Sequence, residues 1–160
     1  MVAILLVTLW GDCLTCVAQT GGQTSCHDFV RDFYDGYLKA DLKSANYETE
    51  VREHPSLFSD QIRRGLLRKL KLEEDGQIHG FEFDPFLNAQ DAPGPYTLDS
   101  ASERDTSCKA SLHSGSGPNR VKVNVELTSF KGSWRFTDFI YTTDGKQQRL
   151  TSLLRKDALR

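Results

Sequence analysis

Three polar residues near the middle of the chain have the types and spacing to bind a ligand or a cation. Asp84, Gln90 and Asp91 would offer side-chain oxygen atoms, the ligands that hard cations such as Ca²⁺ prefer. The same residue types also cap turns, because their side chains accept hydrogen bonds from nearby backbone amides. The Asp and Gly spacing of a calcium-binding loop is absent, so the pattern favours the structural role.

Signatures of the common catalytic and metal sites do not occur in the sequence. There is no Gly-x-Ser-x-Gly turn, no Walker-type phosphate loop and no His-Glu-x-x-His zinc motif. The histidines are too scattered for zinc-ligand spacing: they are His27, His54, His79 and His113. We therefore expect neither a metal ion nor a cofactor, and no residue stands out as catalytic.

Residues 1–18 form an apolar stretch that predicts a signal peptide. Nearly every residue from Met1 to Trp10 is apolar, and Cys16-Val17-Ala18 places small residues before a cleavage point at Gln19. A positive n-region is missing, since the first basic residue is Arg31, and a buried N-terminal strand is the alternative. The stretch predicts an exported protein, periplasmic or extracellular.

Membrane attachment is the less favoured interpretation of this stretch. A transmembrane helix needs about 20 apolar residues, whereas Asp12 interrupts the run. The residues before Cys13 and Cys16 do not form the Leu-small-small sequence that lipid modification requires. We expect no transmembrane helix in the mature chain, and a lipid anchor is the less favoured alternative to a soluble mature chain.

Cleavage would leave a polar, flexible start at 19–24 and a single domain at 25–160. Two of the four cysteines remain, Cys26 and Cys108, and an oxidising compartment favours a disulfide between them. Closing a loop of about 80 residues would contribute roughly 4.5 kcal/mol on the chain-entropy model. Two separate buried thiols are the alternative.

The charge balance argues against two classes of partner. The chain has 20 basic and 22 acidic residues and a net charge of −2. Nucleic acids and strongly anionic membrane surfaces both require a basic face. We therefore expect neither as the main partner.

Helical spacing of apolar residues begins after the polar start. Ser25 suits an N-cap with Asp28 in the first turn, and the period predicts a helix over 26–42. Its aromatic stripe is expected to face the core. A second helix is predicted from a cap at Ser59 or Ser56 to about Glu74, with a basic face that is expected to be solvated, an acidic partner being the alternative.

From about residue 108 the period changes from helical to alternating. The alternation predicts strands over 108–112, 121–127 and 134–141, and leucines at 150–154 predict a short final helix. Helices followed by an antiparallel meander form an α+β fold, with the helices packed on one face of a curved sheet.

Three segments resemble a bacterial family, the domain of unknown function 3828, which includes exported proteins of the YbjP type. Phe33-Tyr34-Asp35-Gly36-Tyr37-Leu38 resembles the family's Phe-Tyr-x-x-Tyr-Leu opening. The run 84–91 resembles its Asp-x-Phe-x-x-Ala-Gln-Asp element, and 132–139 resembles its Gly-x-Trp-x-Ile-x-x-Ile strand. The resemblance spans about residues 28–155. It implies a cystatin-like or nuclear-transport-factor-2-like fold and no assigned activity.

Curved sheets of this kind can enclose a pocket in which a carboxylate transfers protons. Alternation places Trp134, Phe136 and Asp138 on one side of their strand, so that Trp134 and Asp138 could line such a pocket with Tyr34 and Tyr37. The alternative, which we favour, is that these aromatic side chains fill the core.

Together these features predict an exported, non-enzymatic domain that binds a protein partner or a small ligand in the bacterial envelope. An inhibitor-like or immunity-like role falls within this class. The first alternative is a pocket enzyme of the same fold that uses a buried carboxylate for acid–base chemistry. A purely structural, lipoprotein-like role in the envelope is a third possibility.

Overall fold

The computed structural model describes residues 24–39, 46–78, 80–90, 94–143 and 145–156. The predicted signal peptide at 1–18, nearly all of the polar start at 19–24 and the candidate residue Asp91 lie outside the described residues. Within them, no helix is long and apolar enough to cross a membrane.

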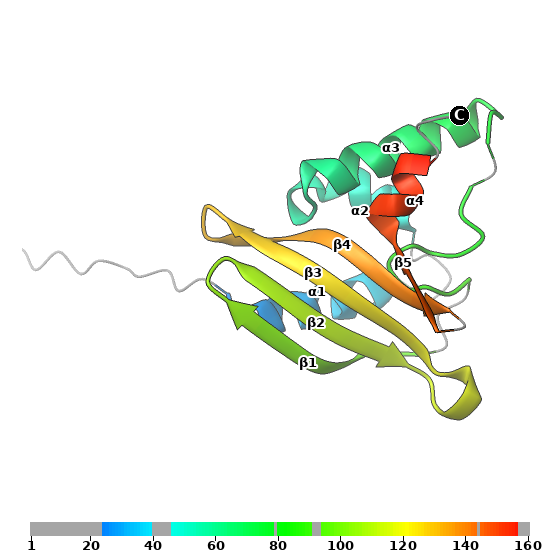
Figure 1. The fold of residues 1–160 in the computed structure, drawn as a ribbon. Helices are drawn as coiled ribbons and strands as arrows, with labels where there is room; N and C mark the ends of the chain where they lie inside the picture. The colour runs from blue at the N-terminus through cyan, green and yellow to red at the C-terminus, as the bar shows by residue number, and fades with distance from the viewer. Residues whose placement is uncertain (1–23, 40–45, 79, 91–93, 144, 157–160) are drawn as a thin grey trace, which may run out of the picture.

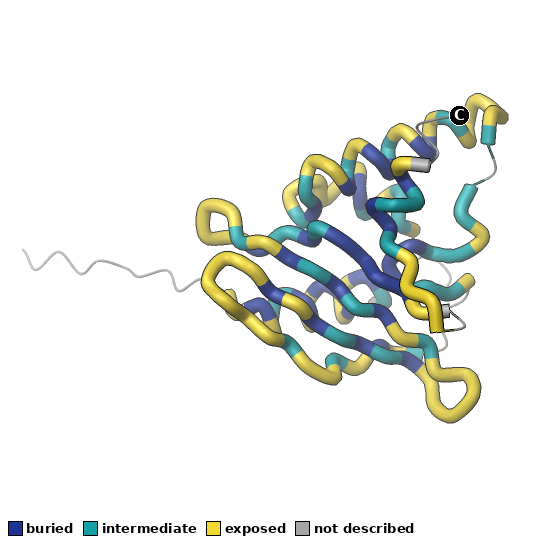
Figure 2. Tube along the Cα trace, viewed as in Figure 1, coloured by how far each residue is buried: buried dark blue, intermediate teal, exposed yellow. Residues whose placement is uncertain are grey.

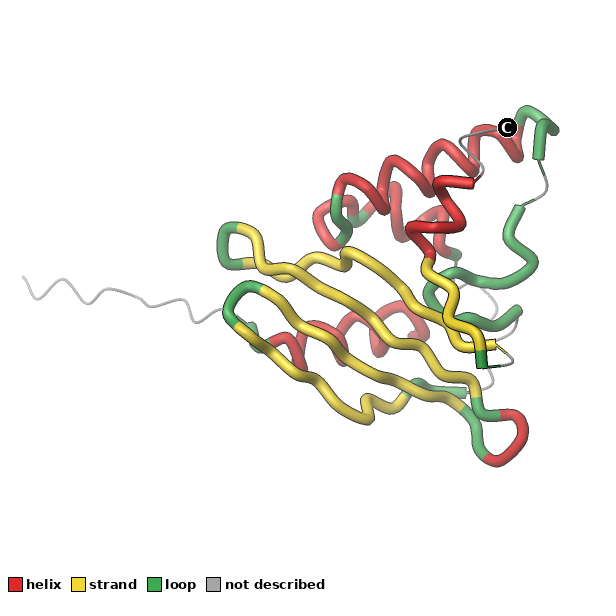
Figure 3. The backbone as a smooth tube through the Cα atoms, in the orientation of Figure 1, coloured by secondary structure: helices red, strands yellow, loops and turns green. Residues whose placement is uncertain are grey.

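An antiparallel sheet of five strands forms the centre of the fold, and each strand pairs with the next one along the chain (Figures 1 and 3). The strands are β1 (Thr97–Arg104), β2 (Ser107–Ser114), β3 (Val121–Phe130), β4 (Ser133–Thr143) and β5 (Lys146–Arg149). The three predicted strands correspond to β2, β3 and β4. The strands at the two edges, β1 and β5, were not predicted because their sequences are almost entirely polar and exposed.

Four α-helices and two short 3₁₀ helices complete the described part of the chain. They are α1 (Cys26–Lys39), α2 (Tyr47–Glu53), η1 (Pro55–Leu57), α3 (Asp60–Glu74), η2 (Gly117–Asn119) and α4 (Leu150–Lys156). Helix α1 crosses one face of the sheet, and α3 and α4 pack together beside β4 (Figure 1). The predicted α+β fold, with helices on a curved antiparallel sheet of the cystatin-like or nuclear-transport-factor-2-like type, is confirmed.

The predicted helix caps are present. The Ser25 hydroxyl accepts a hydrogen bond from the Asp28 amide at 3.1 Å, and the Ser59 hydroxyl accepts one from the Ile62 amide at 3.4 Å. Helix α2 was not predicted, because Val51 is its one buried residue and a single apolar position carries no period.

The basic face predicted for α3 is partly used by the fold. Lys69 is buried, with its Nζ 4.5 Å from the centre of the Phe81 ring. The Arg68 guanidinium donates to the Leu154 carbonyl at 2.9 Å, which ties α3 to α4. These two residues therefore stabilise the helix packing rather than form a solvated face.

Aromatic rings fill the space between α1 and the sheet. Figure 2 marks the buried residues along the chain trace. The Phe33 ring lies 4.7 Å from Phe136, and Phe136 lies 5.0 Å from Phe139. Phe86, from the segment between α3 and β1, lies 4.9 Å from Phe139 and 5.1 Å from Phe58. Rings at these separations are in direct contact, so the aromatic stripe of α1 belongs to the core.

The predicted disulfide is present. Cys26, the first residue of α1, is bonded to Cys108 in β2, at a sequence separation of 82. Both cysteines are buried. The bond fixes the start of α1 against the sheet.

The predicted alternation along β4 is wrong after Phe136. Leu127 of β3 pairs with Phe136 and Glu126 pairs with Asp138, so Thr137 is an extra residue in a β-bulge. The bulge brings Phe139 to the core face and turns Asp138 away from the side of Trp134 and Phe136. Asp138 therefore does not line an interior pocket with these aromatic residues.

Candidate functional site

The run around Asp84 folds into a compact turn. The Asp84 amide donates to the Ala89 carbonyl at 2.9 Å, and the Asn88 amide donates to the Asp84 carbonyl at 2.8 Å. Asn88 has a positive φ of 54°, a conformation that asparagine tolerates better than most residues. The turn at 84–89 thus has its own backbone hydrogen bonds.

Three buried tyrosines donate hydrogen bonds to three successive carbonyls of this turn. Tyr141 binds the Pro85 carbonyl at 2.6 Å, Tyr34 binds the Phe86 carbonyl at 2.9 Å, and Tyr96 binds the Leu87 carbonyl. The tyrosines come from β4, α1 and the residue before β1. Buried carbonyls need such donors, and we call this arrangement the tyrosine cage.

Asp84 completes the tyrosine cage from within the turn. Its Oδ1 accepts from the amides of Phe86 and Leu87 at 2.7 and 3.2 Å, and its Oδ2 accepts from the Tyr37 hydroxyl. Burial raises the pKa of the Asp84 carboxyl to about 6, although these three hydrogen bonds act in the opposite direction. The favoured structural interpretation of Asp84 therefore agrees with its contacts.

Of the other two predicted ligand residues, the one that the structure describes does not join Asp84. Gln90 is exposed at the end of the turn, and Asp91 lies outside the described residues. Among the residues that the structure describes, no three His, Cys, Asp or Glu side chains gather closely enough to hold a metal ion.

Asp138 links β4 to the start of α4. Its Oδ2 accepts from Arg149 Nε at 2.6 Å and from the Thr151 hydroxyl at 2.8 Å. Its Oδ1 accepts from the Thr151 amide at 3.1 Å, which caps α4, and from the Phe139 amide. Arg149 also pairs with Glu126 of β3. Asp138 is thus engaged by structural partners on both oxygens.

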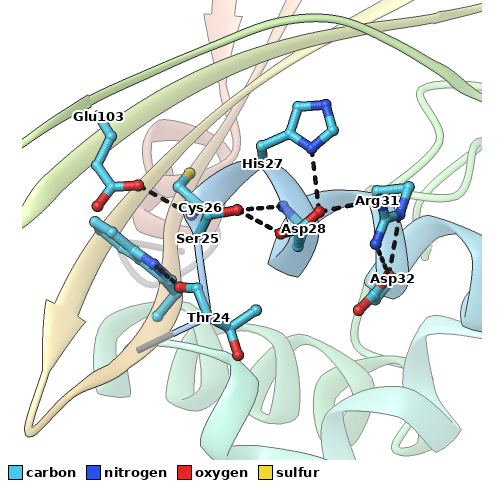
Figure 4. Close-up of polar contacts among 9 residues, drawn as sticks. Thr24, Ser25, Cys26, His27, Asp28, Arg31, Asp32 and Glu103 are labelled. Atoms are coloured by element: carbon cyan, nitrogen blue, oxygen red, sulfur yellow. Dashed lines mark hydrogen bonds and ion pairs between the residues drawn. The ribbon is translucent and has the colours of Figure 1, made fainter. Parts of the chain in front are cut away.

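Trp134 is buried where β4 passes the start of α1. Its indole Nε1 donates to the Thr24 carbonyl at 2.9 Å. Nearby, Glu103 of β1 accepts a hydrogen bond from the Cys26 amide at 3.0 Å, and Asp28 pairs with Arg31 (Figure 4). The contacts of Trp134 and Glu103 fix the start of α1 against the sheet, whereas the Asp28–Arg31 pair lies within the helix.

Two adjoining cavities lie at the surface next to these elements. One, of about 320 Å³, lies between η1 and the β3–β4 turn, and the other, of about 580 Å³, lies between α1 and α2. Both are lined by Thr24, Phe29 and Leu57, so they adjoin one another, and we call the pair of cavities the α1 groove.

An exposed phenylalanine stands at one end of the α1 groove. Phe130 is 50% exposed and is the one large apolar side chain that is exposed in the described part of the chain. Lys131 and Arg135 lie over its ring, at 5.5 and 4.7 Å from the centre. Lys131 has a positive φ of 51°, in the tight turn that presents this ring.

The sequence pattern does not reveal the α1 groove. Phe29 looks like any core residue of an amphipathic helix, and Leu57 lies in a segment without a period. Leu57 is held beside β4 because the nearby Ser59 amide donates to the Phe136 carbonyl at 2.8 Å. The one available signal was Phe130, an aromatic residue directly before a Lys-Gly turn.

Of the seven predicted site residues, Tyr34, Tyr37 and Asp84 meet in the tyrosine cage. Asp138 and Trp134 are buried at two other places, and Tyr37 and Trp134 also contribute to the walls of the α1 groove. The predicted residues that the structure describes therefore do not form a single site.

No protein-family model matches the chain, and no curated protein matches it. A search of solved structures finds a chain in the crystal structure of the type VI native effector–immunity complex Tae3–Tai3 from Ralstonia pickettii. The TM-score is 0.54 at 17% sequence identity, and the match covers 78% of this chain and 100% of that chain. At this identity the similarity shows a shared fold.

Proposed function

We propose that this protein is an exported domain that binds a protein partner in the bacterial envelope, in an inhibitor or immunity role. The observation that carries the proposal is the exposed Phe130 at the end of the α1 groove. Aromatic residues, phenylalanine included, are enriched at protein interfaces relative to the rest of the surface.

The contacts of the candidate catalytic groups favour binding over catalysis. Both oxygens of Asp84 and of Asp138 accept hydrogen bonds from the protein itself, and the thiols of Cys26 and Cys108 are joined. The alternative, a pocket enzyme, would rely on Asp84, whose pKa is about 6. Asp84 lines neither cavity of the α1 groove.

A protein partner is favoured over a small ligand for two reasons. The chain with the similar fold comes from an effector–immunity complex, in which proteins bind each other. In addition, the α1 groove is open and runs along several elements, and a small ligand would be better enclosed by a deep pocket.

Export is supported by the disulfide and by the apolar residues 1–18. Disulfides persist in oxidising compartments such as the periplasm. Membership of family 3828 is part of the same proposal and depends on the three motifs around Tyr34, Asp84 and Trp134.

Site-specific photo-crosslinking in the producing bacterium tests the proposal. A photoreactive amino acid is placed at position 130 and, as a matched control, at position 119. Asn119 is also exposed, but it lies in η2 at the opposite end of the sheet (Figure 1). We expect a crosslinked protein at position 130 and none at position 119.

The purified pair then gives a quantitative result. Replacing Phe130 with Ala should weaken binding of the crosslinked protein by at least tenfold, about 1.4 kcal/mol. The same set of crosslinked proteins at both positions, or no crosslinked protein at either, would contradict the proposal.

A further inference from the structure

We infer that the α1 groove binds one segment of the protein partner in a fixed direction. The segment places an apolar or aromatic side chain against Phe29 and Leu57, a basic side chain toward α2 and an acidic side chain toward the β3–β4 turn. This inference rests on the proposed function and specifies the chemistry of the partner.

The α2 end of the α1 groove is acidic. Asp32, Glu50 and Glu53 line the larger cavity together with His54, and among the described residues no lysine or arginine lines it. Asp32 already pairs with Arg31 at 2.9 Å. By contrast, Glu50 and Glu53 make no hydrogen bond or ion pair with any residue that the structure describes. Two carboxylates at this end are therefore available to a basic group of the partner.

Glu50 is the better placed of these two carboxylates. It is half-buried, and burial raises its pKa above the ordinary value for a glutamate. A carboxylate that has lost part of its water gains more from a cation than a fully solvated one does. A lysine or arginine of the partner would restore what Glu50 loses on burial.

The other end of the α1 groove is basic. Lys131 and Arg135 line the smaller cavity, and no Asp or Glu from the part of the chain that the structure describes lines it. Neither forms an ion pair within the described part of the chain, and both lie over the Phe130 ring instead. Arg135 Nε is buried without a hydrogen-bond partner. The guanidinium is thus held in place on an aromatic face, ready for a carboxylate.

The middle of the α1 groove is apolar and separates the two charged ends. Phe29 and Leu57 line both cavities, and Phe33 lines the larger one. An apolar side chain bound there gains free energy in either orientation of the segment. The reversed orientation would place like charges together at both ends, which disfavours it. The charges therefore select one direction.

Selection of random peptides displayed on phage tests the inference without requiring the natural partner. The probe is a library of random linear peptides, and the bait is the purified, oxidised chain. We expect the enriched peptides to combine a large apolar residue with Lys or Arg on one side and Asp or Glu on the other, always in the same order.

Matched variants identify where these peptides bind. The double replacement Glu50→Gln and Glu53→Gln should weaken peptide binding by about tenfold, because the basic side chain of the peptide loses both of its carboxylate partners. Glu48→Gln is the control, because Glu48 belongs to the same helix but pairs with Arg52 outside the α1 groove. It should leave binding unchanged, and high salt should weaken binding to the wild-type chain.

Three results would overturn the inference. The first is enrichment of peptides without the ordered charges, or of none. The second is equal binding by the Glu50/Glu53 double variant and by Glu48→Gln. The third is a dimer of this chain that dissociates when Phe130 is replaced by Ala, because a second copy would then occupy the α1 groove. If photo-crosslinking at position 130 still yields a partner, only the charge inference fails; if it yields none, the proposed function fails as well.

Discussion

Asp84 shows how one carboxylate can organise a buried segment. It accepts hydrogen bonds from two backbone amides of its own turn and from Tyr37 of α1, 47 residues away in sequence. The charged form gains these bonds but loses its water, and the loss is larger, so the pKa rises to about 6. The residue therefore makes the stability of the protein depend on pH.

The sign of that dependence follows from the raised pKa. The folded protein holds the Asp84 proton more tightly than the unfolded chain does. Protonation of Asp84 therefore stabilises the folded state, fully below about pH 4, and this contribution is lost as the pH rises through about 6. The free energy of unfolding should therefore fall by on the order of 2 to 3 kcal/mol as the pH rises. Asp84→Asn should remove this fall and make the free energy of unfolding less dependent on pH. Urea unfolding across this pH range measures it, with the exposed Glu82→Gln as the control. An unchanged slope in Asp84→Asn would contradict the assignment.

The tyrosine cage makes a second prediction at the residue scale. Tyr141→Phe keeps the ring but leaves the Pro85 carbonyl without its donor, and a buried unsatisfied carbonyl costs about 1 to 3 kcal/mol. Tyr47→Phe is the matched control, because the Tyr47 hydroxyl makes no hydrogen bond with any residue that the structure describes. The free energy of unfolding from urea titrations should fall in the first variant only. Equal effects would mean that the cage bond contributes nothing.

At the scale of elements, α4 depends on a side chain from β4. Asp138 caps its first turn through the Thr151 amide and holds Arg149 directly before it. Gly65 of α3 leaves room for Leu154, because a Cβ at this position would lie 2.7 Å from Leu154 Cδ1. The helix α4 is therefore held in place on two sides by residues of other elements, Asp138 of β4 and Gly65 of α3.

Asp138→Ala should release α4 more than any other element. The amide and hydroxyl of Thr151 and the Arg149 guanidinium lose their acceptor, at a cost of about 2 to 4 kcal/mol. Hydrogen exchange should accelerate in residues 150–156 while α1 stays protected. Asp138→Asn, which keeps an oxygen acceptor, should have a smaller effect. Uniform acceleration over all helices would argue against a local role.

The disulfide connects α1 to the sheet, so its loss should affect the whole fold. The closed loop spans a separation of 82 residues, and the chain-entropy model assigns it about 4.5 kcal/mol. The double variant Cys26→Ala and Cys108→Ala should unfold at a lower urea concentration than the oxidised chain. Its free energy of unfolding should be lower by about 4.5 kcal/mol. The reduced wild-type chain should behave like the variant. If peptide mapping finds both thiols free in the native protein, the bond is absent.

For the whole molecule, folding and binding should depend on different phenylalanines. Phe136 is fully buried in the core, and Phe136→Ala should cost about 3 to 5 kcal/mol. Phe130 is half exposed, so Phe130→Ala should change stability by no more than about 0.5 kcal/mol while it weakens partner binding at least tenfold. Unfolding and binding measured on both variants would show this separation. Comparable destabilisation by the two would make Phe130 a structural residue.

Much of the fold could be predicted from local pattern. The two long helices have caps at Ser25 and Ser59 and apolar residues at helical spacing, and the three central strands alternate because one face is buried. The edge strands β1 and β5 and the helix α2 escaped prediction because few of their residues are buried. An element that buries little apolar surface has no regular spacing of apolar residues, so its sequence does not predict it.

The candidate site could be predicted only in part, because its geometry depends on long-range pairing. The sequence identified Tyr34, Tyr37 and Asp84 as notable but not that they meet in one cage. The β-bulge at Thr137 follows from the pairing of β3 with β4, and it removed Asp138 from the expected pocket. The α1 groove needed α1, η1 and the β3–β4 turn in place.

By itself, the sequence determined the α+β class, the aromatic core and the cysteine pair, because periodicity and residue type act locally along the chain. The tertiary structure alone decided which polar groups satisfy one another and which surface stays open. The hydroxyl of Tyr141 reaches the carbonyl of Pro85 across 56 residues, and the same packing leaves Phe130 exposed. Whether a residue is buried depends on how the elements pack together. Only the tertiary structure therefore shows whether a given polar or aromatic residue stabilises the fold or is exposed for binding.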